Sequence, residues 1–122
     1  MPTILVVDDA AFMRLRCSKA LNASGFDTVE AANGTQAIQT YYAVKPDAVL
    51  MDIDMPEMTG LDALRTIMAI DPGARVVMLT AQGQQRVVMD AIKAGARGYV
   101  IKPYQPAKIL EAVQQALSGQ SA

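Results

Sequence analysis

Five short apolar segments recur along the chain at intervals of twenty-odd residues, and this spacing constrains its fold more than any other feature. The first, third and fourth are nearly continuous runs of Val, Ile, Leu and Met, as expected for strands covered on both faces. The second is less apolar, which favours a position at the edge of a sheet. The segments span Ile4–Val7, Thr28–Ala31, Ala48–Met51, Arg75–Leu79 and Tyr99–Ile101.

Apolar residues at helical spacing fill the intervals between these segments. Met13, Cys17, Ala20 and Leu21 form the first pattern, and Gly25 is expected to cap that helix. The other patterns are Ala37, Ile38 and Tyr41, then Leu61, Leu64, Ile67 and Met68, then Met89, Ile92 and Ala96, and finally Ile109, Leu110, Val113, Ala116 and Leu117. Breakers flank them at Pro46, Asp71-Pro72-Gly73, Gly95 and Pro106. One strand with its crossover helix needs about this length, so the pattern predicts an α/β protein with a (βα)5 doubly wound five-stranded parallel sheet.

Composition supports one globular domain over residues 1–122, because 52% of the residues are apolar and no linker interrupts the pattern. Acidic and basic residues are interspersed and the net charge is −1, so direct binding of nucleic acid is not expected. No apolar run is long enough for a membrane span. An Asp pair follows the first seven residues, which argues against a signal peptide and favours the cytoplasm. Residues Ser118–Ala122 are expected to form a frayed end.

The chain has no histidine and a single cysteine, Cys17, and this restricts its chemistry. An internal disulfide, a Ser-His-Asp triad and a zinc site built with histidine are all excluded. Any metal site must consist mostly of oxygen ligands, which favours magnesium or calcium. Cys17 lies on the apolar stripe of its predicted helix, so we interpret it as a packing residue.

Polar side chains fall where the predicted strands end, at Asp8, Asp9, Asp52, Thr80 and Lys102. The carboxyl ends of parallel strands share one edge, where open α/β sheets bind ligands. If the first and third strands are neighbours, three carboxylates converge there and raise each other's pKa values. A bound hard cation relieves this repulsion. Carboxylates, a cation, a lysine and a hydroxyl suit phosphoryl transfer, in which an Asp can itself be the nucleophile.

Four motifs in this order make the chain resemble response-regulator receiver domains, especially the stand-alone chemotaxis type. They are Val6-Val7-Asp8-Asp9, Asp52-Ile53-Asp54-Met55-Pro56 with Gly60, Leu79-Thr80-Ala81, and Gly98-Tyr99-Val100-Ile101-Lys102-Pro103. The resemblance covers Thr3 to about Leu117. It implies a flavodoxin-like strand order of 2-1-3-4-5 and a role in two-component signalling as a phosphorylated switch, not as an enzyme.

The resemblance also implies a role for each acidic residue. Asp52 would be the phosphoacceptor and a metal ligand. Asp9 would bind Mg²⁺ directly, Asp8 would do so directly or through a water, and the backbone carbonyl of Asp54 would complete the protein ligands, with Mn²⁺ as a substitute. The Asp54 side chain and Gln82 would adjust the lifetime of the phosphoryl group.

The remaining matched positions imply the switch and its partners. Lys102 would pair with one phosphoryl oxygen and precede a cis peptide bond to Pro103, while Thr80 would donate to another oxygen. Tyr99 would turn inward when Thr80 moves. The phosphoryl donor would be a histidine kinase or a histidine phosphotransfer protein. A target protein would bind the helix 4–strand 5–helix 5 face through Val87, Val88 and Tyr99, and the receiver would be a monomer or a phosphorylation-dependent dimer.

Two positions depart from the family pattern. Ala10 stands where Ser or Glu is common, so a contact around the metal is missing. Thr59 stands where Asp or Asn is common, which affects the turn before Gly60.

Plainer interpretations compete with these roles. Asp8 or Asp9 could cap the first helix, Thr80 could cap the fourth, Tyr99 could be a core aromatic, and Lys102 could be an ordinary solvated lysine. Two other functions also remain open. Asp52-Ile53-Asp54 resembles the Asp-x-Asp of haloacid-dehalogenase-like phosphatases, although that family places the motif near the N-terminus. The chain could also be a pseudo-receiver that binds partners without phosphorylation.

Overall fold

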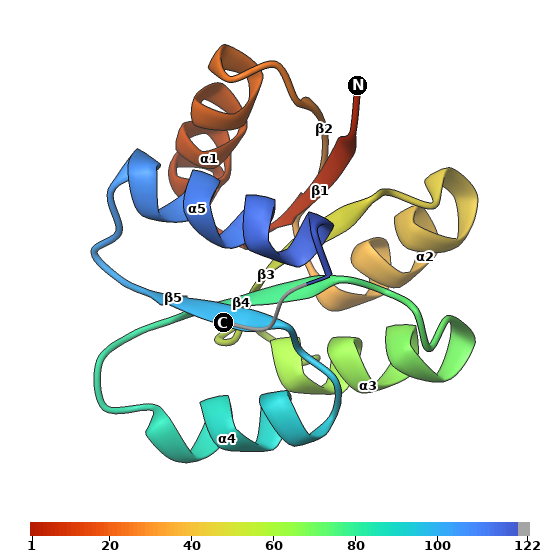
Figure 1. The fold of residues 1–122 in the computed structure, drawn as a ribbon. Coiled ribbons are helices and arrows are strands. Elements are labelled where there is room, and N and C mark those ends of the chain that lie inside the picture. The colour runs from red at the N-terminus through yellow and green to blue at the C-terminus, as the bar shows by residue number, and fades with distance from the viewer. Residues whose placement is uncertain (120–122) are drawn as a thin grey trace.

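Five strands alternate with five helices over residues 1–119, which the computed structural model describes (Figure 1). The strands are β1 Thr3–Val7, β2 Asp27–Ala31, β3 Ala48–Asp52, β4 Val76–Thr80 and β5 Gly98–Ile101. The helices are α1 Ala11–Ala23, α2 Gly34–Val44, α3 Gly60–Ile70, α4 Gln85–Lys93 and α5 Pro106–Leu117. The predicted (βα)5 pattern is confirmed, and each strand boundary lies within one residue of its prediction.

All strand pairs are parallel, and the sheet order is β2-β1-β3-β4-β5. This confirms the order that the resemblance implied and the edge position expected for the second strand. Because β1 and β3 are neighbours, with Val7 opposite Met51, the residues that follow β1 meet the end of β3. The order of strands reverses between β1 and β3, which is where sheets of this kind bind ligands.

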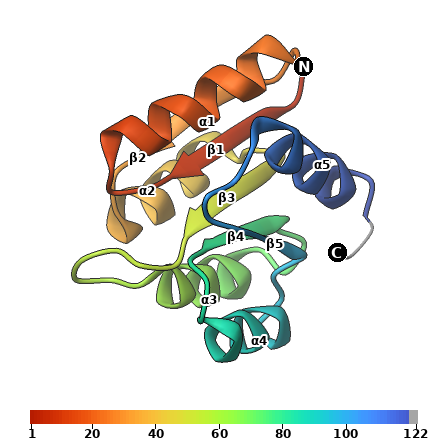
Figure 2. The ribbon, with the colours of Figure 1, turned by 90° about the vertical axis from the view of Figure 1, so that its left-hand side faces the viewer.

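Helices cover both faces of the sheet, with α1 and α5 on one side and α2, α3 and α4 on the other (Figures 1 and 2). Side chains alternate between the faces along each strand. In β1, Ile4 and Val6 pack in the cluster that includes Ile109 of α5, whereas Leu5 and Val7 pack in the cluster with α2 and α3. Burial on both faces explains why β1, β3 and β4 consist almost entirely of apolar residues.

Two helices end one residue or more from their predicted boundaries. Ser24 occupies the C-cap of α1, and Gly25 follows it with a φ of 92°. Helix α4 ends at Lys93, so Ala96 lies beyond the helix and packs in the core from the following loop. Gly95 causes this ending because its φ of 116° lies in the left-handed region, which glycine adopts without strain.

The C-terminal residues were expected to fray from Ser118 onward. The backbone N–H groups of Ser118 and Gly119 instead donate to the carbonyls of Gln114 and Ala116. Residues 120–122 lie outside the described part of the chain. Within residues 1–119, none of the helices combines the length and the apolar character that a bilayer crossing requires.

Tyr41 connects α2 to the end of α3, and its contact gives a stability prediction. Its buried hydroxyl donates to a carboxylate oxygen of Asp71 at 2.7 Å. Tyr41→Phe should lower the free energy of unfolding by about 1.5 kcal/mol, because the hydrogen bond is lost while the ring remains. Chemical denaturation measures the change. Tyr42→Phe is the matched control, since that neighbouring side chain is 69% exposed; equal stability of the two variants would contradict the prediction.

Candidate functional site

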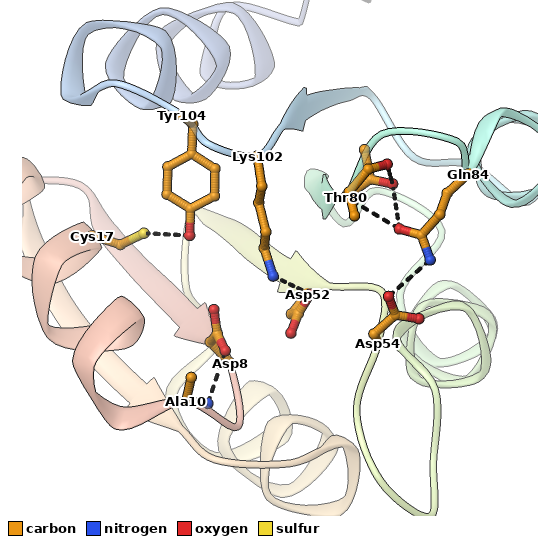
Figure 3. A network of polar contacts seen from close by, with 10 residues as sticks. Asp8, Ala10, Cys17, Asp52, Asp54, Thr80, Gln84, Lys102 and Tyr104 are labelled. Carbon is orange, nitrogen blue, oxygen red and sulfur yellow. Dashed lines mark hydrogen bonds and ion pairs between the residues drawn. The ribbon is translucent and has the colours of Figure 1, made fainter.

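The predicted polar residues meet at the carboxyl edge of the sheet. Asp8 follows β1, Asp52 and Thr80 are the last residues of β3 and β4, and Lys102 follows β5. Figure 3 shows these side chains pointing into one region from four different strands. Their expected convergence is confirmed, and it results from the parallel direction of all five strands.

Three carboxylates form the centre of this region. Asp8, Asp9 and Asp52 each offer an oxygen within 4.8 Å of the others. Asp8 and Asp52 are only 1% and 3% exposed, whereas Asp9 is exposed. The Asp8 Oδ2 atom is buried and has no hydrogen-bond partner among residues 1–119. Because an unpaired buried carboxylate oxygen is costly, this donor set fits a hard cation such as Mg²⁺.

The turn after β1 does not use its acids as a conventional helix cap. Ala10 is the N-cap residue of α1 and has no side-chain cap hydrogen bond. Asp8 Oδ1 accepts the Ala10 N–H at 2.9 Å, which orients the carboxylate from within the turn. The capping interpretation of Asp8 and Asp9 is therefore wrong.

Arg14 supports this turn, and sequence reasoning missed it. Its Nη1 donates to the carbonyl oxygen of Asp8 at 2.7 Å, and its Nε pairs with Glu30 at 3.0 Å. Arg14 lies in the first turn of α1, whereas Glu30 lies on β2. The sequence gives no signal that these two residues meet, because they are brought together only by the packing of the helix beside the strand.

Asp52 and Lys102 form an ion pair at the centre of the site. The Lys102 Nζ lies 3.0 Å from Asp52 Oδ1. Burial raises the pKa of the Asp52 carboxyl to about 6, although the hydrogen bond and charge of Lys102 oppose the shift. Burial lowers the pKa of Lys102, but the hydrogen bond and charge of Asp52 outweigh it and the pKa ends above its usual value. Lys102 is therefore a paired cation and not an ordinary solvated lysine, and the peptide bond from Lys102 to Pro103 is cis.

The loop after β3 packs tightly against the strand end. A Cβ atom on Gly60 would lie 2.1 Å from the carbonyl oxygen of Asp52. The Gly60 N–H donates to the Ile53 carbonyl at 2.8 Å, which fixes the start of α3 under the site. Thr59 caps this helix by accepting the N–H of Asp62 at 3.2 Å. The unusual Thr59 thus keeps the capping function that Asp or Asn would supply.

Thr80 contacts a residue that sequence reasoning did not select. Its hydroxyl donates to Gln84 Oε1 at 2.8 Å, and Gln84 Nε2 donates to Asp54 Oδ2 at 2.8 Å (Figure 3). Gln84 is the N-cap residue of α4, so the alternative that Thr80 caps this helix is wrong. Gln82 is exposed and makes none of the side-chain hydrogen bonds found within residues 1–119. Only the path of the loop distinguishes the two glutamines.

Tyr99 lies on β5 with its side chain on the α4 side of the molecule. It is 44% exposed, so it is not a core aromatic. With Met89, Ile92 and Ile101 it lines an apolar groove of about 750 Å³ that reaches Thr80. Val87 and Val88 were expected to form this face; both are half-buried and pack against the core, and of the two only Val88 also lines the groove. The helical pattern predicted here rested on Met89, Ile92 and Ala96, but Met89 and Ile92 are exposed, so the spacing did not identify the side of α4 that faces the sheet.

Cys17 packs in the core of the α1–α5 side, as predicted. Its thiol is buried and lies 3.5 Å from the hydroxyl of Tyr104. Burial raises the pKa of the Cys17 thiol, so the thiolate is disfavoured. Tyr104, which sequence reasoning did not consider, directs its hydroxyl at this thiol (Figure 3).

A doubly wound sheet with acids, a hydroxyl and a lysine at its carboxyl edge defines a class of α/β proteins that bind a cation and an anionic group at the strand switch point. Residues 4–114 match the family model described as the response regulator receiver domain. The chain therefore belongs to the response-regulator receiver family and acts in two-component signal transduction. This match favours the receiver interpretation over a haloacid-dehalogenase-like phosphatase.

Relatives and solved structures agree with this assignment. The chain is 47% identical to the chemotaxis protein CheY of Thermotoga maritima over 92% of this chain and 94% of that protein. It is 50% identical to CheY of Bacillus subtilis over 94% of this chain and 97% of that protein. The receiver domain of NtrX from Brucella abortus superposes with a TM-score of 0.91 at 28% identity, covering 94% of this chain and 98% of that one.

Proposed function

We propose that Asp52 accepts a phosphoryl group from the phosphohistidine of a histidine kinase or a histidine phosphotransfer protein. The observation that carries this proposal is the buried Asp52 carboxylate, paired with Lys102 at 3.0 Å and adjoining two further acids. Residues 1–122 contain no histidine, so the donor histidine must lie outside them.

Asp8, Asp9 and Asp52 would hold Mg²⁺, or Mn²⁺ in its place, together with the backbone carbonyl of Asp54. The buried and unpartnered Asp8 Oδ2 supports this proposal. When bound, the cation supplies positive charge beside the oxygens of the transferring phosphoryl group.

Asp52, Lys102 and Thr80 would each have a separate role in the phosphoryl transfer. An Asp52 oxygen attacks phosphorus in line, so a P–O bond forms as the P–N bond to the donor histidine breaks. The Lys102 ammonium neutralises a phosphoryl oxygen, and the Thr80 hydroxyl donates to another. Water later cleaves the acyl phosphate and restores the carboxylate. The Asp54 side chain and Gln82 are both exposed in the loops that follow β3 and β4. They would set how fast that water reaches the acyl phosphate.

The output of the phosphorylated chain would be altered binding of a target protein. Movement of Thr80 toward the phosphoryl group leaves space for Tyr99 to turn inward, which changes the groove between α4 and β5. Helix α5 completes this face beside β5. Since the similar proteins are chemotaxis proteins, we propose a chemotaxis target and a cytoplasmic location. Residues 1–122 would act as one receiver domain, as a monomer or a phosphorylation-dependent dimer, with no substrate apart from its own phosphoryl group.

Incubation with acetyl phosphate and Mg²⁺, followed by intact-mass measurement, tests this function. The protein should gain one phosphoryl group, lose it on treatment with hydroxylamine as an acyl phosphate does, and gain none when EDTA removes the metal. No gain in mass, together with no binding of Mg²⁺ in a titration near neutral pH, would instead support the pseudo-receiver alternative.

Mg²⁺ affinity should depend on pH because of the raised pKa of Asp52. With a pKa of about 6 in the metal-free protein, the carboxyl is ionised above that pH and protonated below it. A protonated carboxyl is a poor metal ligand. Affinity at about pH 5 should therefore be up to about tenfold weaker than at about pH 7, as measured by isothermal titration calorimetry. Asp52→Asn should bind Mg²⁺ more weakly, and its affinity should no longer change in this way with pH. An unchanged pH dependence in that variant would contradict the assignment of the change to Asp52.

A further inference from the structure

The Gln84 side chain joins the loop after β4 to the loop after β3, and the proposed function does not use it (Figure 3). Its Oε1 accepts both the Thr80 hydroxyl and the Ala81 N–H at 2.8 Å. Its Nε2 donates to Asp54 Oδ2, also at 2.8 Å. One carboxamide therefore connects the Thr80 hydroxyl, which would donate to the phosphoryl group, to the exposed carboxylate of Asp54.

We propose that Gln84 is a positioning residue that holds Thr80 in its resting position and must release it when Asp52 is phosphorylated. This inference rests on the proposed function. It adds a residue that competes with the phosphoryl group for the Thr80 hydroxyl.

The competition follows from the hydrogen-bonding capacity of a hydroxyl, which has a single proton to donate. In the resting structure that proton has two acceptors, Gln84 Oε1 at 2.8 Å and the Ala81 carbonyl oxygen at 3.1 Å. Thr80 is buried, so no exposed position is open to its hydroxyl. Donation to a phosphoryl oxygen on Asp52 therefore requires the bond to Gln84 to break.

The position of Gln84 also connects this event to the partner face. Gln84 is the N-cap residue of α4, and it lines the groove that Met89 and Tyr99 also line. When Thr80 leaves, Gln84 loses one of its three hydrogen bonds, and the start of α4 becomes less restrained. The groove can then change shape from the helix side as well as from the Tyr99 side.

Titration with beryllofluoride, an analogue of the phosphoryl group on a carboxylate, tests the competition in the presence of saturating Mg²⁺. The Ala81 amide resonance in ¹H–¹⁵N spectra gives the readout, because its N–H donates to Gln84. Gln84→Ala should bind beryllofluoride about fivefold more tightly than the wild type, which corresponds to one typical net hydrogen bond. Gln85→Ala is the matched control: this neighbouring glutamine is exposed, and its variant should bind as the wild type does.

A charged variant separates competition from a general loss of stability. Gln84→Glu keeps an acceptor for Thr80 and Ala81 and strengthens it by a charge, while it repels Asp54. It should therefore bind beryllofluoride more weakly than the wild type, whereas Gln84→Ala binds more tightly. Gln85→Glu carries the same added charge one position along, so the difference between the two Glu variants excludes simple repulsion of the anion.

Two further results complete the test. In a Thr80→Val background, Gln84→Ala should produce no additional change in affinity, because the competing hydroxyl is already absent. A fivefold gain that persists there, or equal affinities of Gln84→Ala and the wild type, would overturn the role of Gln84 and leave the proposed function intact. Failure of the wild type to bind beryllofluoride or to accept phosphoryl from acetyl phosphate would overturn both proposals.

Discussion

Asp52→Asn is expected to take up no phosphoryl group from acetyl phosphate, whereas the wild type is modified at one site. The amide that replaces the carboxylate has nearly the same shape, so the fold should persist. It has no anionic oxygen to attack phosphorus, and the rate should fall by at least about a hundredfold. Intact mass as a function of time measures the loss.

Asp54→Asn is the matched control for this result, because it makes the same chemical change two residues further along the chain. Its side chain lies outside the acid cluster and accepts only from Gln84 among the described residues. Asp54→Asn should therefore be phosphorylated, with an altered lifetime of the acyl phosphate. Equal phosphorylation of Asp52→Asn and the wild type would refute the assignment of the phosphoacceptor.

Gly60→Ala is expected to cause the largest loss of stability of any single methyl addition considered for this chain. The new Cβ would lie 2.1 Å from the Asp52 carbonyl oxygen and 2.9 Å from the Ile53 Cα. Both neighbours are backbone atoms, so either the end of β3 or the start of α3 must move. A loss of about 3 kcal/mol or more in the free energy of unfolding follows, measured by chemical denaturation.

The same shift would move Asp52, so Gly60→Ala should also be phosphorylated more slowly. Gly73→Ala is a suitable control, because a Cβ there meets only the Asp71 side chain at 3.4 Å. That variant should unfold within about 0.5 kcal/mol of the wild type. Indistinguishable denaturation curves for the Gly60 and Gly73 variants would contradict this account of the close packing.

The strands could be predicted from the sequence because their signal is local. A strand buried on both faces is apolar along nearly its whole length, and β1, β3 and β4 have this property apart from a polar residue at one end of each. Asp52 and Thr80 were expected where the third and fourth strands end, although both lie just beyond the apolar runs that predicted these strands. Both belong to the ladder, with Asp52 opposite Leu79 and Thr80 opposite Ile101. Backbone hydrogen bonding therefore continues one residue beyond each apolar run, to the polar residue that was expected at the strand end.

The chemistry of the acid cluster was also accessible from the sequence. Topology requires parallel strands to end at one edge, so Asp8, Asp52 and Lys102 could be expected to meet once the strands were known. The resemblance then supplied the strand order, and with it the adjacency of β1 and β3. Lys102 was expected to pair with a phosphoryl oxygen beside the acids, whereas its ion pair with Asp52 at 3.0 Å is seen only in the tertiary structure.

What the sequence determined by itself is therefore the alternation of strands and helices and the chemical character of the edge where the strands end. Both depend on short-range periodicity and on residue type. The tertiary structure alone decided that Gln84 and not Gln82 contacts Thr80, that Arg14 supports the β1–α1 turn, and that Met89 and Ile92 face outward from α4. These contacts depend on the path of loops and the rotation of a helix against its neighbours, which arise from packing between residues far apart in the chain.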